Sequence, residues 1–249
     1  MPPTPDPDAF RAALRTPAAG PPALSGAGVP DWLWQTAVAL HEHLPPDTAD
    51  DWAARLRGAL DGAAPAPTLG TAHAWYAHTV LPLLMTTHPE DRSALAALAG
   101  LHRAAAHRAP AGQDTWTAAL HPVLLLLYDS AYDRAGARAD AYEGAHGYAL
   151  ANGFSPADAD AYGHTYAGLS TDANAHAGAR AHASALAPLL AEAFAAADAR
   201  AYAETFPAAQ VRTVVRAAAA RGATSAAPRL ADALSALLAE GPPGTRSGG

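Results

Sequence analysis

A cluster of tyrosines and aspartates follows the most apolar segment of the chain, residues 123–128. The cluster consists of Tyr128, Asp129, Tyr132 and Asp133. In a helix, Asp129 and Asp133 lie one turn apart, where two carboxylates repel each other, and more strongly when they are desolvated. A nearby arginine such as Arg134 or Arg138, a metal ion or a shared proton would compensate them. The pattern predicts a polar ligand or metal site here, or alternatively a helix that leaves the core with its carboxylates solvated or paired with arginine.

The twelve histidines are the other candidates for metal binding and proton transfer. Helical histidine pairs that share a metal lie three or four positions apart, but His73 and His78 are separated by five, as are His102 and His107. At about 100° per residue, the members of each pair lie roughly 140° apart around the helix. We therefore expect a histidine to reach the aspartates from a neighbouring helix, with His73, His78 and His121 as candidates.

A Glu-x-x-His pair, Glu143 with His146, matches the ligand pattern of di-iron sites in ferritin-like bundles. That fold needs a second such pair and two more inward-facing glutamates. The chain has six glutamates and no second pair, and the Asp-x-x-x-His pairs at residues 160–164 and 172–176 have a different spacing. Glu143 and His146 are therefore weaker metal candidates than the aspartate cluster.

Several kinds of chemistry are excluded by residues that the chain lacks. Without cysteine there are no disulfides, thiolate metal sites, iron–sulfur clusters or cysteine nucleophiles, and any haem would be bound non-covalently. Without lysine there is no Schiff-base chemistry through that side chain. Neither a Gly-x-Ser-x-Gly nucleophile motif nor a glycine-rich phosphate loop after a strand is found. The sequence identifies no cofactor.

The composition predicts an almost wholly helical protein. The 249 residues include 71 alanines and no isoleucine. Alanine is the best helix former, whereas β-branched and aromatic residues favour strands. Arginine as the sole strongly basic residue is what a G+C-rich genome produces, so it does not indicate phosphate recognition.

The charge and hydropathy patterns exclude two kinds of partner. The net charge is −7 and the arginines are scattered, which argues against nucleic-acid binding. The longest apolar run, residues 123–128, is too short to span a bilayer, and the N-terminus lacks the basic and apolar regions of a signal peptide. We therefore expect a cytoplasmic protein without a membrane partner.

The spacing of apolar residues and helix-terminating residues predicts an all-α multi-helix bundle of about eight to eleven helices, with no significant sheet. Residues 1–30 are expected to form a flexible Pro/Gly-rich arm with a short helical stretch around Phe10 to Leu14. Residues 31–240 are expected to form a single helical domain, possibly subdivided near residue 112, and residues 241–249 a disordered tail. A helix over residues 69–87 should kink at Pro82. A central helix should begin at Asp114, and it could continue as far as Asn152.

The second half predicts long Ala-rich antiparallel helices. Gly153-Phe154-Ser155-Pro156 combines a glycine helix end with a serine-capped helix start, and Gly168-Leu169-Ser170 repeats the pattern as a second corner or a kink. Flanking these are alanines at four-residue spacing, which would let neighbouring helices approach closely. The two ladders are Ala137, Ala141, Ala145, Ala149 and Ala173, Ala177, Ala181, Ala185.

These features support three hypotheses about function. The first is a helical module without catalytic activity that binds a small apolar molecule or a partner protein helix. It depends on the five tryptophans of the first half, which could line a pocket beside the central helix or simply fill the core. The second is a metal- or haem-dependent helical-bundle enzyme that uses histidine and aspartate from the central helices. The third is an oligomeric scaffold, a homo-oligomer joined through the alanine ladders.

Overall fold

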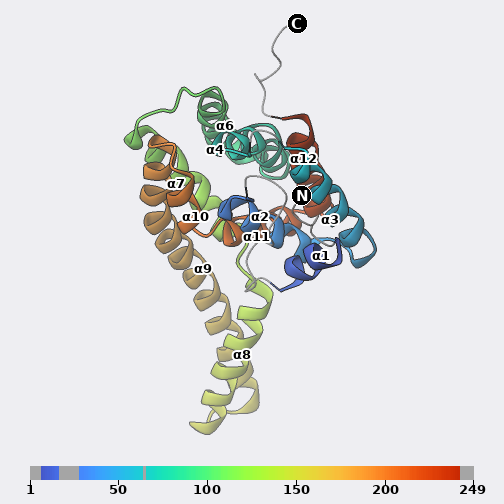
Figure 1. The fold of residues 1–249 in the computed structure, drawn as a ribbon. Helices are drawn as coiled ribbons and strands as arrows, with labels where there is room; N and C mark the ends of the chain where they lie inside the picture. The colour runs from blue at the N-terminus through green and yellow to red at the C-terminus, as the bar shows by residue number, and fades with distance from the viewer. Residues whose placement is uncertain (1–6, 17–27, 64–65, 242–249) are drawn as a thin grey trace, which may run out of the picture.

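The structure is a computed structural model that describes residues 7–16, 28–63 and 66–241. These ranges are almost entirely helical and contain no strand, so the predicted all-α bundle is confirmed for them. Figure 1 labels the helices in chain order. They are α1 (Pro7–Arg15), α2 (Asp31–His43), α3 (Pro46–Asp61), α4 (Leu69–Trp75), α5 (Leu81–Thr87), α6 (Arg92–Ala106), α7 (Gln113–Ser130), α8 (Arg134–Ala151), α9 (Pro156–Ala195), α10 (Ala199–Glu204), α11 (Pro207–Ala220) and α12 (Ala226–Glu240).

Helix α1 is packed into the body, although the sequence predicted a mostly flexible segment here. Phe10 and Leu14, in the stretch predicted to be helical, are fully buried, and the ring of Phe10 packs edge-on against Trp34 at 5.7 Å. The Arg15 guanidinium also donates a hydrogen bond of 2.6 Å to Asp50 in α3. Most of the predicted flexible N-terminal segment and of the predicted C-terminal tail lies outside the described residues, at positions 1–6, 17–27 and 242–249.

One hydrophobic core joins α1–α7, the C-terminal part of α9 and α10–α12. Indole N–H groups tie the first half of the chain to the last helix. Trp52 donates to the Ala231 carbonyl at 2.9 Å, and Trp75 donates to the Leu230 carbonyl at 3.1 Å. Helices from both sides of residue 112 therefore share this core.

A widened turn precedes Pro82, the residue at which the sequence predicted a kink. Residues Tyr76–Val80 form a π-helical turn between α4 and α5, in which the Leu81 N–H bonds to the Tyr76 carbonyl five residues back. Proline lacks an N–H, and its ring would clash with the carbonyl four residues earlier in a regular helix. A π turn immediately before Pro82 therefore accommodates the proline within one continuous helix from residue 69 to 87.

The central helix ends earlier than the longest extent that the sequence allowed. Helix α7 stops at Ser130, and α8 begins at Arg134. A continuation to Asn152 is therefore wrong. The reason is local, because Asp133 is the N-cap of α8 and its carboxylate accepts a hydrogen bond of 3.0 Å from the Gly136 N–H.

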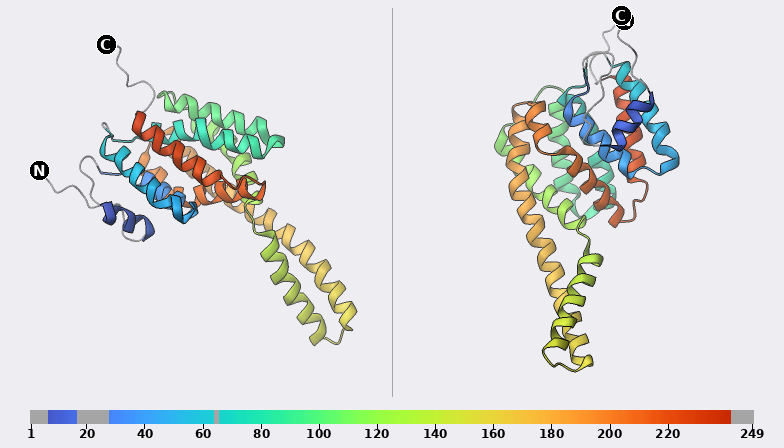
Figure 2. Two further views of the ribbon diagram at one scale, coloured as in Figure 1. Left: turned by 90° about the vertical axis from the view of Figure 1, so that its right-hand side faces the viewer. Right: turned by 60° about the horizontal axis from the view of Figure 1, so that its bottom comes forward.

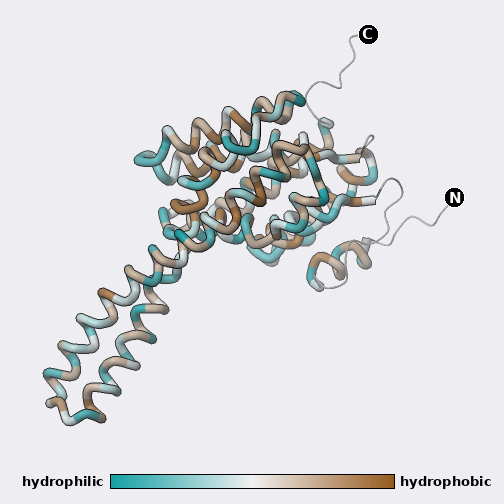
Figure 3. The backbone as a smooth tube through the Cα atoms, turned by 90° about the vertical axis from the view of Figure 1, so that its left-hand side faces the viewer, coloured by the Kyte–Doolittle hydropathy of each residue, from teal (hydrophilic) through white to brown (hydrophobic). Residues whose placement is uncertain are grey.

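Helix α8 and the first half of α9 form an antiparallel hairpin that projects from the body (Figures 1 and 2). We call this hairpin, residues 134–175, the arm. Figure 3 shows hydrophilic and pale segments alternating with hydrophobic ones along both of its helices. Helix α9 spans 40 residues, so it forms one side of the arm and then continues into the body, where it packs against α7. The long antiparallel Ala-rich helices predicted for the second half are confirmed.

The corner at the tip of the arm is confirmed, and its hydrogen bonds explain it. Gly153 has φ +84°, and its N–H bonds to the Leu150 carbonyl, while the Phe154 N–H bonds to the Ala149 carbonyl, both at 3.1 Å. Ser155 then accepts a hydrogen bond from the Asp158 N–H to start α9. The similar sequence at residues 168–170 lies inside α9, so its interpretation as a second corner is wrong.

The predicted alanine ladder of α8 is partly buried, whereas the one predicted for α9 is wrong. In α8, Ala145 and Ala149 are buried, but in α9 the ladder at residues 173–185 is exposed. The buried ladder begins at Ala159 and has the same four-residue spacing. Alanine suits both an exposed and a buried helix face, so spacing alone does not distinguish the two ladders. The buried positions of α9 are Ala159, Gly163, Ala167, Thr171, Ala175, Ala179, Ala183 and Ala187.

Glycine is expected to act in opposite directions at two helix ends. Ala197, which ends α9, has φ +52°, a conformation that costs an L-residue about 1–2 kcal/mol but costs glycine little. Ala197→Gly should therefore raise the free energy of unfolding by about 1 kcal/mol, whereas Gly153→Val should lower it by about 1 kcal/mol or more. Urea denaturation of both variants tests this, and a Gly153→Val protein as stable as the wild type would contradict it.

Candidate functional site

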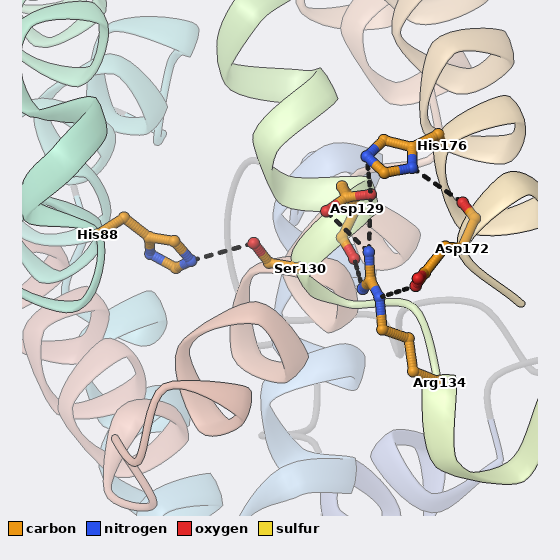
Figure 4. A network of polar contacts seen from close by, with 6 residues as sticks. All are labelled: His88, Asp129, Ser130, Arg134, Asp172 and His176. Carbon is orange, nitrogen blue, oxygen red and sulfur yellow. Dashed lines mark hydrogen bonds and ion pairs between the residues drawn. The ribbon is translucent and has the colours of Figure 1, made fainter. Parts of the chain in front are cut away.

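The base of the arm holds a network of charged side chains, which we call the junction network (Figure 4). The Arg134 guanidinium donates to both carboxylate oxygens of Asp129, at 2.9 and 3.0 Å, and to its carbonyl at 2.6 Å. The same guanidinium lies 3.6 Å from the Asp172 carboxylate. His176 Nε2 lies 3.8 Å from Asp129 Oδ1. Arginine is therefore the group that compensates Asp129, and the network joins α7, α8 and α9.

A second polar contact ties the end of α7 to the end of α5. The His88 ring is fully buried, and its Nε2 lies 3.2 Å from Ser130 Oγ (Figure 4). Its Nδ1 lies 2.8 Å from Thr87 Oγ1. Burial lowers the pKa of His88, and the Arg221 charge adds to this effect. The imidazole is thus a neutral link within the body.

The structure separates the residues of the predicted aspartate site. Asp133 is exposed and caps α8, so it does not share a site with Asp129. Tyr132 is half-buried. Tyr128 stacks on His182 with ring centroids 4.3 Å apart, and burial raises the pKa of its hydroxyl.

The histidine near Asp129 comes from a helix that the sequence analysis did not select. His78 and His121 are exposed, and His73 is paired with His102 inside the body. His176 of α9 takes the expected place. The signal for it was the spacing of Asp172 and His176, which are four residues apart and both reach the junction network.

The weaker metal candidates lie in the middle of the arm. Glu143 is exposed, while the ring of His146 stacks on Tyr142 at 5.4 Å. Tyr142 also packs on His164 at 4.6 Å and donates a hydrogen bond of 2.6 Å to Asp160, which raises the pKa of the tyrosine. Across the ranges that the structure describes, no three histidine, aspartate or glutamate side chains are grouped so that they could hold a metal ion.

The Tyr142 ring occupies the space left by a missing side chain on α9. A Cβ at Gly163 would lie 2.9 Å from this ring, whereas a Cβ at Gly168 would meet nothing within 4 Å. Gly163→Ala should therefore be about 1–3 kcal/mol less stable than Gly168→Ala, because both gain helix propensity but only the first clashes. Denaturation and amide hydrogen exchange in residues 141–151 test this. Equal stability of the two variants would mean that the hairpin is not packed as described.

A buried cluster of aromatic and histidine side chains lies at the centre of the body. His73 and His102 are each about 97–99% buried, and their Nδ1 atoms are 2.9 Å apart, so one donates and the other accepts. Trp116 and Phe194 pack on both imidazoles, with ring centroids between 4.9 and 5.6 Å apart. Burial lowers the pKa of His73 to about 4 and also lowers that of His102 strongly, with a further contribution from His73. Both rings are therefore neutral at pH 7.

A cavity of about 40 Å³ lies beside this cluster. Its wall is mainly aliphatic, with polar groups from His102, Tyr76, Tyr128, Gln210 and Thr213. Sites for small organic ligands usually have volumes of about 300–1,000 Å³, whereas one water molecule needs about 10–15 Å³. The cavity therefore has room for water but not for a haem or another organic ligand.

A wider groove of about 610 Å³ runs along the surface between α3 and α12. It is lined mostly by glycine and alanine, and the ion pair between Arg55 and Asp232, at 2.6 Å, is on its wall. Its other polar lining group is the buried hydroxyl of Ser235, which has no hydrogen-bond partner among the described residues. Because most of its lining is glycine and alanine, the groove offers few polar side chains that could bind or orient a ligand.

The exposed apolar side chains of the described residues are concentrated on the arm. Eight large apolar side chains are exposed, and six of them belong to the arm. The ring of Phe154 lies 6.0 Å from Tyr162, which lies 6.2 Å from Tyr166, so these three form a continuous surface that we call the arm patch. The six are Tyr148, Leu150, Phe154, Tyr162, Tyr166 and Leu169, whereas Leu189 and Phe206 lie elsewhere.

Comparisons with known proteins add no relative to this description. No protein-family model, no curated protein and no solved structure matches the chain. Among the described helices, none is both long enough and apolar enough to cross a membrane. The three candidates that the geometry offers are thus the junction network, the buried histidine cluster and the arm patch.

Proposed function

We propose that this protein is an interaction module without catalytic activity, and that its arm binds a partner protein. The observation that carries the proposal is the concentration of exposed aromatic side chains on a hairpin that projects from the body (Figure 2). Contiguous exposed apolar patches on soluble proteins commonly mark interaction sites. Burying one aromatic ring of the patch would contribute about 1.5–3 kcal/mol.

The geometry of the polar groups supports a binding role over a catalytic one. The His73 and His102 Nδ1 atoms are hydrogen-bonded to each other at 2.9 Å, and among the described residues no third histidine, aspartate or glutamate is grouped with them to complete a metal site. In the junction network, Arg134 already binds both oxygens of Asp129. The polar side chains of both clusters already have hydrogen-bond partners within the chain, whereas the apolar side chains of the arm patch are exposed to solvent.

The same reasoning favours a partner protein over a small apolar molecule. The internal cavity of about 40 Å³ is too small for an organic ligand, and the surface groove between α3 and α12 has few groups that could orient one. The oligomeric scaffold is less well supported, because the buried ladder of α9 is used within the chain.

Photo-crosslinking in the cells that produce the protein tests the proposal. A photoreactive amino acid at position 166 should yield a discrete protein adduct, whereas one at position 189, exposed on the same helix but outside the arm, should not. Phe154→Ser combined with Tyr162→Ser should abolish the adduct without changing the melting temperature. If positions 148, 162 and 166 all yield no adduct, the arm is not a binding surface and the proposal is wrong.

A further inference from the structure

We infer that the partner of the arm is basic, a protein helix that presents arginine or lysine side chains beside apolar ones. This inference rests on the proposed function, because it concerns the chemistry of the surface that the arm patch would cover. Three observations carry it: the charge of the arm, the arrangement of its tyrosines, and the repulsion between two copies.

Beyond its base, the arm is acidic. The arm, residues 134–175, holds two arginines, no lysine and five carboxylates, so its formal charge is −3, and both arginines lie at its base end of α8, Arg134 and Arg138. No arginine in the ranges described forms an ion pair with the outer four, and only Asp172, at the base, lies near one. The five carboxylates are those of Asp140, Glu143, Asp158, Asp160 and Asp172.

One of these carboxylates, that of Asp158, forms a row with two tyrosines along α9. Asp158, Tyr162 and Tyr166 are spaced by four residues, so they follow one another on the same side of the helix, and Leu169 continues the row. Tyr162 and Tyr166 are 39% and 49% exposed, and their rings are inclined by only 22°. Guanidinium and ammonium groups bind the faces of tyrosine rings and pair with carboxylates. A basic side chain crossing this row would meet both kinds of group.

A second copy of the chain does not fit this surface electrostatically. Two arms placed side by side would bring the four outer carboxylates of one copy near those of the other, while Arg134 of each copy is held in the junction network at the base. Like charges facing each other across an interface disfavour association. The charge of the arm therefore selects a basic partner and acts against self-association.

Two helical peptides of 18 residues, with leucine on one face and either arginine or glutamate beside it, test the inference. Fluorescence anisotropy of the labelled peptides with the full chain should show binding of the arginine peptide and at least about tenfold weaker binding of the glutamate peptide. Raising NaCl from 50 to 300 mM should weaken the arginine complex by about tenfold, since screening acts on exposed charges. Tyr162→Ser with Tyr166→Ser should reduce its affinity by at least about tenfold, the loss of about 1.4 kcal/mol. Phe206→Ser, an exposed aromatic outside the arm, should leave it unchanged.

Several results would overturn the inference. They are equal affinity for the two peptides, no binding of the arginine peptide at 100 µM, or binding that the tyrosine substitutions leave unchanged. Light scattering that finds a dimer, lost in the tyrosine variant, would mean that a second copy covers the patch. If the protein crosslinked at position 166 contacts the arm through a segment without arginine or lysine, the proposed function stands and this inference fails.

Discussion

Lowering the pH from 7.5 to 4.5 is expected to destabilise the fold by about 2.5 kcal/mol through His73 alone. Burial holds its pKa at about 4 in the folded protein, against 6.5 when the chain is unfolded. As the pH falls below 6.5, the unfolded chain binds a proton that the folded protein does not bind. The stability is therefore complete above pH 6.5 and is lost progressively down to about pH 4, and His102 contributes in the same direction.

Urea denaturation at the two pH values measures this effect. In a His73→Leu/His102→Leu double variant, both polar partners are replaced together, so no buried nitrogen is left unpaired. Acidification should destabilise this variant by at least about 2.5 kcal/mol less than it destabilises the wild type. His121→Gln, at an exposed position, is the matched control and should keep the full pH dependence. If the double variant and the wild type respond alike, the imidazole pair is not the source of the acid sensitivity.

Ala183→Leu is expected to destabilise the protein by about 1–3 kcal/mol or more. Ala183 is completely buried and belongs to the core where α9 packs against the rest of the body. Three additional carbon atoms at this position would force the helices apart or into strained rotamers. Thermal unfolding should show a lower melting temperature with unchanged helicity.

Ala181→Leu provides the control for this substitution. It lies two residues away on the same helix, in the exposed ladder, and the change should alter stability by no more than about 0.5 kcal/mol. The same holds for Ala177→Leu, whose residue the sequence pattern placed at a helix contact. If Ala181→Leu were as damaging as Ala183→Leu, the rotation of α9 about its axis would differ from that described.

The fold could be predicted from the sequence where local chemistry decides it. Gly153, Ser155 and Pro156 each favour one backbone conformation, so the corner was correct. The α9 ladder was wrong because its two faces carry the same residue type at the same spacing. Here the choice depends on packing against α7 and α8, which is a property of the whole fold and not of the helix.

The candidate site was predictable only in part for a similar reason. Arg134 was among the compensating groups considered for Asp129, and it is the one that binds that carboxylate. Asp133 was taken for its partner, but the three-residue connection between α7 and α8 turns it into a helix cap. His73 and His102 are 29 positions apart on separate helices, so their contact could not be predicted from residue spacing along the chain.

The two sides of the arm are attached to the body in different ways. Helix α9 crosses the junction without a break, as a rod of about 60 Å at 1.5 Å per residue, whereas α8 is joined to α7 through residues 131–133. One side of the arm is therefore continuous with a helix of the core, while the other side depends on a short connection for its position. The junction network crosses this connection, because Arg134 of α8 contacts Asp129 of α7 and Asp172 of α9. A partner that binds the arm is therefore connected to the core through one unbroken helix. Any displacement of the arm would act on the packing of α9 against α7.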